Sequence, residues 1–431
     1  MFGPQPAPVR LGLLGCGTVG GALVELVAAE AATIAERTGI GLAVSAVAVR
    51  DLARPRPAAL PPGALTADAG AVVTDPAVDV VVELMGGVEP ARTLVLDALK
   101  AGKPVVTANK QLVAVHGAEL FEAAAAAGVD LLYEAAVAGA IPLIRPLRES
   151  LAGERISRVM GIVNGTTNYV LTRMADEGAS YADALAQAQA LGYAEADPTA
   201  DVEGEDAAAK AAILATIAFG VQVVAGDVHR EGITAVTRAD IAFAARLGYV
   251  VKLLAVAESG EGEVGVRVHP AMVPATHPLA AVRDAFNAVF VEGDAVGELM
   301  FYGRGAGGRP TASAVLGDVI DAAHNLQVGG RGRAVPMVRA RLRPMAELRS
   351  QYYLSLGVAD RPGVLAAVAA VFGDHRVSIR SMEQEGLGDE ARLVFITHKA
   401  AERDVQATLA DLRHLDAVTR VGGLLRVIGP E

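Results

Sequence analysis

The sequence predicts an α/β protein in three parts: a doubly wound parallel-sheet domain over residues 1–140, an α+β domain over 141–302, and a ferredoxin-like unit over 351–431. Three observations support this prediction. Short apolar runs alternate with helical stretches in the first 135 residues, a glycine-rich turn follows the first run, and the C-terminal region has the order βαββαβ. Residues at about 303–330 are expected to complete the first domain, and residues 331–350 to connect the second to the third.

The candidate strands of the first domain are apolar along nearly their whole length rather than on alternate residues. This pattern is expected when helices cover both faces of a parallel sheet. The strands are Val9–Leu14, Leu42–Val49, Val78–Leu84, Pro104–Thr107 and Val129–Glu134.

The pattern changes after Ile141, where helices rich in Ala, Gln and Leu mix with alternating strands such as Gly265–His269. The 331–350 segment is rich in arginine, has little periodicity, and is expected to be a linker or an exposed connection. The strands predicted after it are Tyr352–Ala359, Arg376–Gln384, Arg392–Thr397 and Ala417–Val427, with helices at Val364–Phe372 and Ala401–Leu412.

Composition excludes several classes of protein. The net charge of −11 argues against DNA or RNA as a partner, because a phosphate-rich partner favours a basic face. The longest apolar run, 211–225, is shorter than the roughly 20 residues a membrane span needs, so we expect a buried helix and no membrane partner. A single cysteine, Cys16, permits no internal disulfide, and the N-terminus does not have the pattern of a signal peptide, so we expect a cytoplasmic protein.

The glycine-rich turn has the sequence GCGTVG and directly follows the first strand. Gly15 permits a tight turn, Gly17 lets the backbone approach a pyrophosphate, and Gly20 lets helix and strand pack closely. The pyrophosphate would meet the N–H groups of the helix that Thr18 and Val19 begin. The pattern therefore predicts a Rossmann dinucleotide-binding domain and a hydride-transfer enzyme; a tight turn that binds no ligand is the alternative.

The end of the second strand bears on which nicotinamide dinucleotide binds. Arg50 and Arg54 favour NADP, because an arginine can pair with the 2′-phosphate, whereas Asp51 keeps NAD open. Cys16 lies in the pyrophosphate turn rather than beside the nicotinamide ring. The sequence therefore excludes a dehydrogenase that works through a cysteine thioester.

An acidic segment precedes the apolar helix predicted at 211–225. Six carboxylates lie within residues 195–206, and Lys210 follows them at the head of a segment expected to be buried. Only six of the 38 basic residues are lysines, and lysine, unlike arginine, can move a proton. We interpret Lys210 as a catalytic group; a solvated acidic loop with Asp206 and Lys210 as an ordinary helical ion pair is the alternative.

Three further segments are candidates for the site. Lys110 follows the fourth strand, and ligands of such sheets bind beyond the carboxyl ends of the strands. The polar cluster 161–168 (GIVNGTTN) supplies many donors and acceptors. A second glycine-rich loop, 303–311, could approach the cofactor from another side or could be a plain linker.

Five motifs together resemble those of homoserine dehydrogenases. These are GCGTVG, PVVTANK, YEAAVAGAIP, NGTTNY and LGYAEADPTADVEGEDAAAK, which occur in the family's order over roughly residues 9–340. The last of them is highly specific. The arginine-rich connector and the βαββαβ unit resemble the longer bacterial form of the family, which carries a C-terminal ACT domain.

The resemblance implies reduction of L-aspartate 4-semialdehyde to L-homoserine with NADPH or NADH, on the route to threonine, isoleucine and methionine. It implies that Lys210 is the general acid and that Lys110 lies between substrate and cofactor. It also implies that Glu195, Asp206 and Asp201 bind the amino-acid substrate. These roles are chemically reasonable, because an ammonium group favours carboxylates and a developing alkoxide needs a proton donor.

The resemblance also places Gly192 near the nicotinamide and Gly305 against the cofactor. It implies a sodium site formed largely by backbone carbonyls, and oxygen ligands suit such a hard cation. Taken alone, that segment reads as a buried strand and turn. The implied sodium ligands are Glu134, Val137, Gly139 and Ile141.

ACT domains bind amino acids at domain interfaces, so the resemblance implies L-threonine as an effector and a homodimer or homotetramer. Asp360–Gly363 fits the first strand-to-helix turn of these domains. Many effector-binding ACT domains have Asn-Ile where this chain has Ser378 and Ile379, which leaves the effector open. Another Rossmann dehydrogenase of an amino acid, or a non-catalytic amino-acid-sensing regulator, are the alternative functions.

Overall fold

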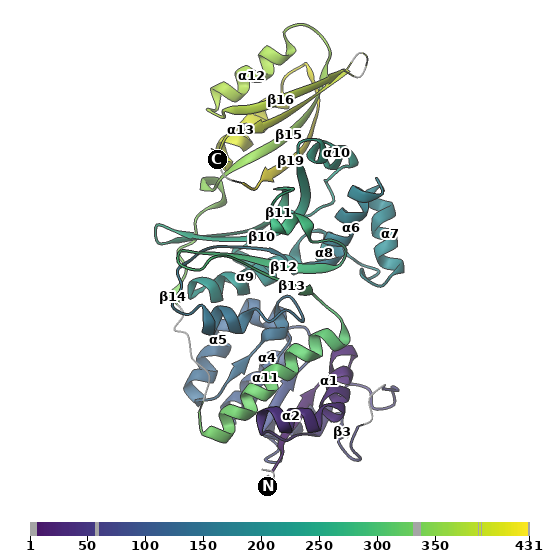
Figure 1. The fold of residues 1–431 in the computed structure, drawn as a ribbon, viewed down its shortest axis with the longest axis vertical. Helices are drawn as coiled ribbons and strands as arrows, with labels where there is room; N and C mark the ends of the chain where they lie inside the picture. The colour runs from purple at the N-terminus through teal and green to yellow at the C-terminus, as the bar shows by residue number, and fades with distance from the viewer. Residues whose placement is uncertain (1–6, 57–59, 331–337, 387, 389, 430–431) are drawn as a thin grey trace. The chain divides into compact units, whose positions relative to one another are not determined.

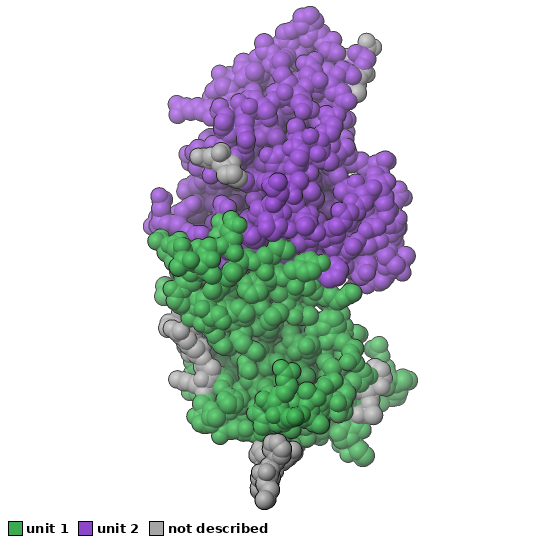
Figure 2. Space-filling view, in the orientation of Figure 1, with its two compact units in different colours: residues 1–156, 209–227, 292–340 green, residues 157–208, 228–291, 341–431 purple. Residues whose placement is uncertain are grey.

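The computed structural model describes residues 7–56, 60–330, 338–386, 388 and 390–429. By its contacts the chain forms two compact units, coloured separately in Figure 2. Unit 1 comprises residues 1–156, 209–227 and 292–340, and unit 2 comprises 157–208, 228–291 and 341–431. This division differs from the predicted domain ranges. Residues 209–227 of the predicted substrate domain belong to unit 1, and the C-terminal region belongs to the same unit as most of the substrate domain.

Unit 1 contains a six-stranded parallel sheet in the order β3-β2-β1-β4-β5-β6. The order reverses direction between β1 and β4, the point at which doubly wound sheets bind ligands. The strands are β1 (Val9–Leu14), β2 (Leu42–Ala48), β3 (Leu65–Thr66), β4 (Val80–Glu83), β5 (Val105–Thr107) and β6 (Leu131–Leu132).

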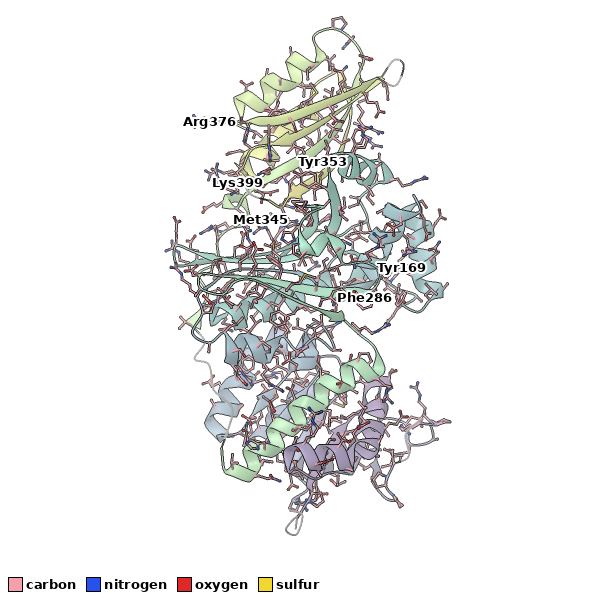
Figure 3. All side chains as sticks on the ribbon, in the orientation of Figure 1. Tyr169, Phe286, Met345, Tyr353, Arg376 and Lys399 are labelled. Carbon is pink, nitrogen blue, oxygen red and sulfur yellow. The ribbon has the colours of Figure 1, made fainter. Side chains whose placement is uncertain are left out.

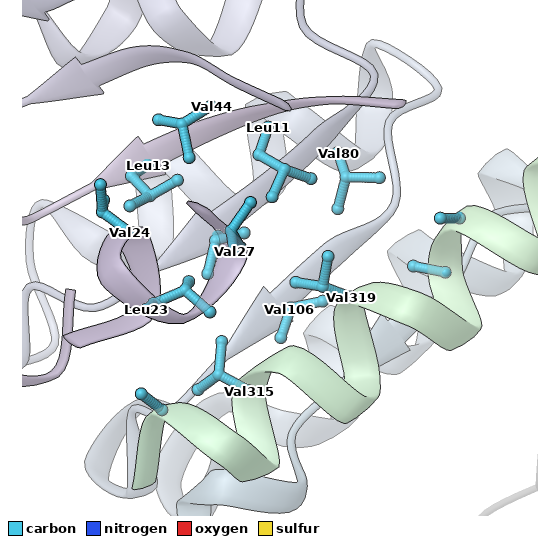
Figure 4. Packing of buried hydrophobic residues seen from close by; sticks show 14 of the residues in the cluster. Leu11, Leu13, Leu23, Val24, Val27, Val44, Val80, Val106, Val315 and Val319 are labelled. Atoms are coloured by element: carbon cyan, nitrogen blue, oxygen red, sulfur yellow. The ribbon is translucent and has the colours of Figure 1, made fainter. Parts of the chain in front are cut away.

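Helices cover this sheet, as Figure 1 shows for α1 and α11, which lie side by side. Leu11 and Val106 of the sheet pack against Leu23 of α1 and Val315 and Val319 of α11 (Figure 4). The helices are α1 (Thr18–Ala29), α2 (Ala31–Thr38), α3 (Ala69–Thr74), α4 (Ala91–Lys100), α5 (Lys110–Ala127) and α11 (Gly308–Val328). Shorter elements of the unit are η1 (Glu134–Ala136), η2 (Pro146–Ser150), β8 (Val221–Gln222), η3 (Ala225–Asp227), β13 (Gly297–Arg304) and β14 (Val338–Arg339).

The α/β fold class is confirmed for this region, since all five predicted strands occur. The fifth is shorter than predicted, because the chain turns into η1 after Tyr133. The two-residue β3 was not predicted, because such a short strand has no periodicity to detect. The first part of the apolar run 211–225 lies in α9 (Glu205–Phe219), a largely buried helix that begins in unit 2 and continues into unit 1. The helix is shorter than predicted, because it ends at Phe219 and Gly220, with φ of +65°, leads into β8.

The strands of unit 2 follow the order β12-β7-β10-β11-β19-β15-β17-β16. The long antiparallel hairpin of β10 and β11 forms the centre of the sheet. The strands of the substrate region are β7 (Ile156–Ile162), β9 (His229–Arg230), β10 (Tyr249–Gly260), β11 (Glu263–Pro274) and β12 (Phe286–Gly293). Its helices are α6 (Gly165–Asp176), α7 (Tyr181–Ala190), α8 (Thr199–Val202), α10 (Arg238–Arg246) and η4 (Pro278–Ala281).

The C-terminal region has the predicted βαββαβ order. Its strands lie in the spatial order fourth, first, third, second, which is the ferredoxin-like arrangement. A separate apolar core includes Tyr352, Val368, Phe372 and Phe395. The elements are β15 (Arg349–Ala359), α12 (Val364–Asp374), β16 (Ile379–Gly386), β17 (Glu390–Thr397), β18 (Ala400–Ala401), α13 (Glu402–Leu412) and β19 (Val418–Val427).

The C-terminal domain shares its sheet with the substrate region, because β19 pairs in parallel with β11. The predicted connector is more ordered than a plain linker where it is described. Arg341 and Arg343 pair with Glu263 on the β10–β11 hairpin at 2.9 and 3.4 Å, and Leu348 is buried after the short η5 (Met345–Glu347). Its first part, 331–337, lies outside the described residues.

Among the residues described, no single helix is long and apolar enough to cross a membrane. The bent pair α1 and α2 passes that test only when its two helices are taken together.

Candidate active site

The glycine turn, residues 15–20, connects β1 to α1 at the switch point of the parallel sheet. Gly15 has φ of +100°, and a Cβ there would lie 2.8 Å from the carbonyl oxygen of Leu84. A Cβ at Gly20 would lie 2.6 Å from the carbonyl oxygen of Gly15. At Gly17, by contrast, a Cβ would meet nothing within 4 Å. Two glycines therefore make the tight turn, and the third leaves the backbone open to a ligand.

The second glycine-rich loop lies against the glycine turn within unit 1. A Cβ at Gly308 would lie 2.9 Å from Cγ2 of Thr18, and Val19 follows as the next residue of α1. The same loop also contacts the predicted sodium segment, because a Cβ at Gly139 would lie 2.3 Å from the carbonyl oxygen of Gly305. Three segments that are distant in sequence thus come together, and each close approach requires a glycine.

The residues predicted to distinguish the two dinucleotides follow β2 and are exposed. The carboxylate of Asp51 accepts a hydrogen bond from the backbone N–H of Ala53 at 2.9 Å. Arg50 and Arg54 lie on the surface on either side of this turn. The acid therefore has a local structural role, and both arginines predicted to pair with a 2′-phosphate are exposed there.

Lys110 begins α5, directly beyond the carboxyl end of β5. Asn109 caps this helix by accepting from the N–H of Leu112 at 3.1 Å. Thr107 accepts from the N–H of Asn109 and donates its hydroxyl to the fully buried Glu83 at 2.6 Å. A lysine in the first turn opposes the helix dipole, so helix stability does not explain its position.

Glu83 was not identified from the sequence. Its carboxylate also accepts from the backbone N–H groups of Met85 and Gly86, at 2.8 and 3.3 Å. It thereby orders the loop after β4 as well as the start of α5. The available signal was an acid at the carboxyl end of an otherwise apolar strand.

Asn164 connects the polar cluster to the acidic segment. Its side-chain oxygen caps α6 by accepting from the N–H of Thr167 at 2.9 Å. Its amide nitrogen donates to the carboxylates of both Asp201 and Asp206, at 2.7 and 2.8 Å. Because the oxygen is committed to the helix, the amide must present its two N–H groups to the carboxylates. We call Asp201 and Asp206 the carboxylate pair.

Glu195 and Gly192 lie in an exposed segment before α8. The hydroxyl of Thr166 donates to the carbonyl of Tyr193 at 2.7 Å, which ties this segment to α6. The ring of Tyr193 also packs at a 45° tilt against that of Tyr169 of α6, labelled in Figure 3, with the ring centroids 5.1 Å apart. Gly192 has φ of +75° and open space around it. Among the described side-chain bonds, Asn164 gathers Asp201 and Asp206 but not Glu195.

Lys210 lies on α9 one turn after Asp206 and is 9% exposed. Burial alone does not mark it as catalytic, because Lys252 on β10 is only 2% exposed. Lys252 donates to Oδ1 of Asn168 at 2.9 Å and to the carbonyl of Val282, and burial lowers its pKa to about 8. The distinguishing feature of Lys210 is its position after the carboxylate pair.

The predicted sodium segment is buried and turns sharply at Ala138 and Gly139, which both have positive φ. The Glu134 carboxylate accepts from the backbone N–H groups of Ile144 and Arg145 at 2.7 and 2.9 Å. That side chain thus caps the following helical turn, and the backbone carbonyls are the groups left to face an ion. Among the described residues, no group of three or more His, Cys, Asp and Glu could hold a metal. A carbonyl site therefore suits only a hard cation.

Asp318 of α11 supports the same segment and was not identified from the sequence. It is 3% exposed, accepts from the N–H of Glu134 at 2.7 Å, and pairs with Arg145 at 3.1 Å. Burial, together with the charge of Glu134, raises the pKa of Asp318 to about 7. It lies in the interior of a helix whose sequence gives no sign of this contact.

Comparisons with known proteins agree with this geometry. Residues 15–134 match the homoserine dehydrogenase NAD-binding domain, residues 142–320 match homoserine dehydrogenase, and residues 352–417 match the ACT domain. The homoserine dehydrogenase of Corynebacterium glutamicum is 50% identical over 99% of this chain and 98% of its own length. That of Mycobacterium tuberculosis is 52% identical over 98% of each chain.

Solved structures show the same similarity. A homoserine dehydrogenase from Thiobacillus denitrificans superposes with a TM-score of 0.93 at 44% identity, covering 98% of each chain. A hyperthermophilic archaeal homoserine dehydrogenase in complex with NADPH superposes with a TM-score of 0.64 at 29% identity, covering 74% of this chain and 98% of that one. The prediction of a three-part fold with an ACT domain is confirmed, and the chain belongs to the homoserine dehydrogenases, oxidoreductases that act on a CH–OH group.

Proposed function

We propose that this chain interconverts L-aspartate 4-semialdehyde and L-homoserine with NADP as its preferred dinucleotide, a step toward threonine, isoleucine and methionine. The observation that carries the proposal is the carboxylate pair. Asn164, which caps α6, donates from its amide nitrogen to both carboxylates at 2.7 and 2.8 Å. Two neighbouring carboxylates at fixed positions suit the ammonium group of an amino-acid substrate. Glu195, on the exposed segment tied to α6, contributes a third carboxylate.

The glycine turn binds the dinucleotide in this proposal. The open backbone at Gly17 and the start of α1 present N–H groups to the pyrophosphate. Gly305 in the second loop and Gly192 before α8 contact the rest of the cofactor. When bound, the nicotinamide accepts or supplies the hydride; the residues of this chain orient it and handle the proton.

The preference for NADP is supported by the local role of Asp51. Its carboxylate is bonded to the N–H of Ala53, which makes it less available to a ribose hydroxyl. Arg50 is exposed and can pair with a 2′-phosphate. An archaeal relative has been solved in complex with NADPH. We therefore expect NAD to bind more weakly than NADP.

Lys210 is the general acid of the reduction. It donates a proton to the carbonyl oxygen of the semialdehyde as hydride reaches the carbon, and recovers one from solvent after homoserine leaves. Its place on α9 after Asp206 supports this role. Lys110 is the second lysine, and its position at the start of α5 places a positive charge beyond the sheet, where oxyanion charge would be stabilised.

We also propose a sodium ion held by the backbone carbonyls of Glu134, Val137, Gly139 and Ile141. The support is that the Glu134 carboxylate is already engaged as a cap and that the segment is buried, so the donors left are carbonyls. Such an ion would fix the turn that packs on Gly305.

The remaining proposals concern assembly and regulation. We propose a cytoplasmic homodimer or homotetramer with L-threonine as the effector of the ACT domain. The match to the ACT family supports an amino-acid ligand. Ser378, in place of the more usual asparagine, favours weak inhibition.

Following formation of the reduced dinucleotide with L-homoserine as substrate tests this function. NADP⁺ and NAD⁺ are supplied separately, and L-serine, one methylene shorter, is the control substrate. We expect turnover with homoserine, at least tenfold higher kcat/KM with NADP⁺, and very slow turnover with serine. Absence of homoserine oxidation with either dinucleotide would refute the proposal.

A further inference from the structure

Residues 229–234, which we call the strap, lie against the turn that carries Asp201. A Cβ at Gly232 would lie 2.2 Å from the carbonyl oxygen of Val202, so only glycine fits there. The N–H of Ile233 donates to the same carbonyl at 2.8 Å. Two side-chain bonds add to this contact, from Thr234 to Glu203 at 3.1 Å and from Arg230 to Glu205 at 2.8 Å. The position of Asp201 therefore follows the position of the strap.

Glu231 fixes the strap. Its backbone N–H donates to Val268 of β11 at 2.8 Å, and its carboxylate accepts from both terminal nitrogens of Arg426 at 2.7 and 2.8 Å. Burial opposes its charge, but the hydrogen bonds from His229 and Arg426 hold the pKa of Glu231 well below its ordinary value. The carboxylate is thus ionised and held in a bidentate pair, which has a defined geometry.

Arg426 belongs to the C-terminal domain. It lies on β19, is 1% exposed, and also donates to Glu402 of α13 at 2.9 and 3.1 Å. The hydroxyl of Tyr352 on β15 donates to the same Glu402 oxygen at 2.7 Å. The Arg426 guanidinium, which bonds the strap, is therefore fixed within the C-terminal domain by its own strand β19 and by side chains of α13 and β15.

We infer that Glu231 and Arg426 form a positioning link through which the C-terminal domain sets the position of Asp201 and hence the affinity for the amino-acid substrate. This inference rests on the proposed role of the carboxylate pair. Neither residue is placed in contact with substrate; both act through the strap. The link is a continuous chain of hydrogen bonds from Glu402 of α13 to the turn that carries Asp201, and such networks can carry coupling between two sites.

A second buried bond connects the same two regions and serves as a comparison. The hydroxyl of Tyr353, labelled in Figure 3, donates to Asp240 of α10 at 3.1 Å. Asp240 caps α10, because its carboxylate accepts from the N–H and the hydroxyl of Thr237, which lies outside the strap. Loss of this bond removes a similar contact between the C-terminal domain and the substrate region. The bonds between the strap and the turn that carries Asp201 stay in place.

The test measures the KM for L-homoserine, kcat and the dissociation constant of NADPH in the full chain. Glu231→Ala should raise the homoserine KM about tenfold and leave kcat and NADPH binding within twofold. Tyr353→Phe, the matched control, should leave all three within twofold. In the double variant Glu231→Ala with Arg426→Met, the second substitution should add less than a further twofold to KM, since the link is already broken.

A homoserine KM within twofold of the wild type in a folded Glu231→Ala variant would overturn the inference. If Arg426→Met fails to fold, Glu231→Ala alone decides, because its side chain is one-third exposed and its removal leaves Arg426 paired with Glu402. A wild-type chain that does not oxidise homoserine would instead refute the proposed function, so the two failures are distinct.

Discussion

The glycine turn and the carboxylate pair are built in opposite ways. The turn owes its shape to missing side chains: Gly15 and Gly20 bring backbone to within contact distance of backbone, and Gly17 leaves space. The carboxylate pair is held by side chains from elsewhere, with Asn164 bonded to both acids and the strap packed behind Asp201. The first region is specified by local backbone geometry, and the second by polar bonds between distant segments.

The difference has consequences for how each region can fail. A backbone turn tolerates changes of charge around it, but not an added Cβ. A pair of carboxylates held by one amide depends on a few bonds, each of which is strong because the acceptor is charged. Single substitutions should therefore alter substrate binding and dinucleotide binding separately.

The largest effect is expected at Lys210. Replacing Lys210 by Met should lower turnover by about 10²-fold or more, because the developing alkoxide loses its proton donor. NADPH binding should stay near normal. Lys103→Met is the matched control, since Lys103 is also buried but bonds the carbonyl of Asp75. Turnover close to wild type in Lys210→Met would exclude the residue as general acid.

Asn164→Ala should have the next largest effect. The carboxylate pair loses two charge-assisted hydrogen bonds but both acids remain in the site. We therefore expect a loss equivalent to about one such bond, roughly 1.5–3 kcal/mol, which is a rise of the homoserine KM by about 10–100-fold. The variant also loses a helix cap, worth about 1 kcal/mol of stability. Ser180→Ala removes a comparable cap from α7 and is the control for that loss. Equal KM values in the two variants would show that the amide does not organise the substrate site.

Arg50→Ala addresses the dinucleotide side of the comparison. It should weaken NADPH more than NADH, by on the order of 1.5–3 kcal/mol, because only NADPH has the 2′-phosphate. Arg37→Ala, an exposed arginine on α2, controls for general charge effects. Binding titrations with both dinucleotides decide the matter, and equal losses would remove Arg50 from the specificity site.

Asp318→Asn should have the smallest effect on catalysis and a clear effect on how the free energy of unfolding depends on pH. The pKa of Asp318 is raised from the ordinary value of 3.8 to about 7. In the pH range between these two values, the folded state keeps a proton that the unfolded state has already released. The free energy of unfolding should therefore fall as pH rises, by on the order of 2 kcal/mol between pH 5 and 7. Asp318→Asn should flatten this slope while the homoserine KM is unchanged. A slope that is the same in both proteins would contradict the shift.

The two regions also differ in how well the sequence predicts them. The glycine turn, the strand order and the βαββαβ unit follow from local patterns, because backbone conformation and burial leave signals within a few residues. The bonds of Asn164 span 37 and 42 residues, and that of Arg426 to Glu231 spans 195. Nothing near Arg426 in the sequence indicates its partner Glu231. The resemblance to a family identified Asp201 and Asp206 as substrate-binding residues. Only the structure shows that Asn164 bonds both of them.

The pairing of β19 with β11 was likewise beyond prediction, because a strand edge has no marker for a partner 155 residues away, the separation of Ala271 and Arg426. It changes how the C-terminal domain should be regarded. A chain ending near Arg349 would lose β19, one of the strands that pair with β11, and leave Glu231 without Arg426. Substrate binding should respond to such a truncation.

The most direct test of the central comparison is a double-mutant cycle between Asn164→Ala and Arg50→Ala. Initial rates over a grid of homoserine and NADP⁺ concentrations give both KM values for the four proteins. If the substrate and dinucleotide regions are built independently, the two losses in kcat/KM should multiply, with a coupling free energy below about 0.5 kcal/mol. A coupling above about 1 kcal/mol would show that the two regions are organised as one, and would contradict the account.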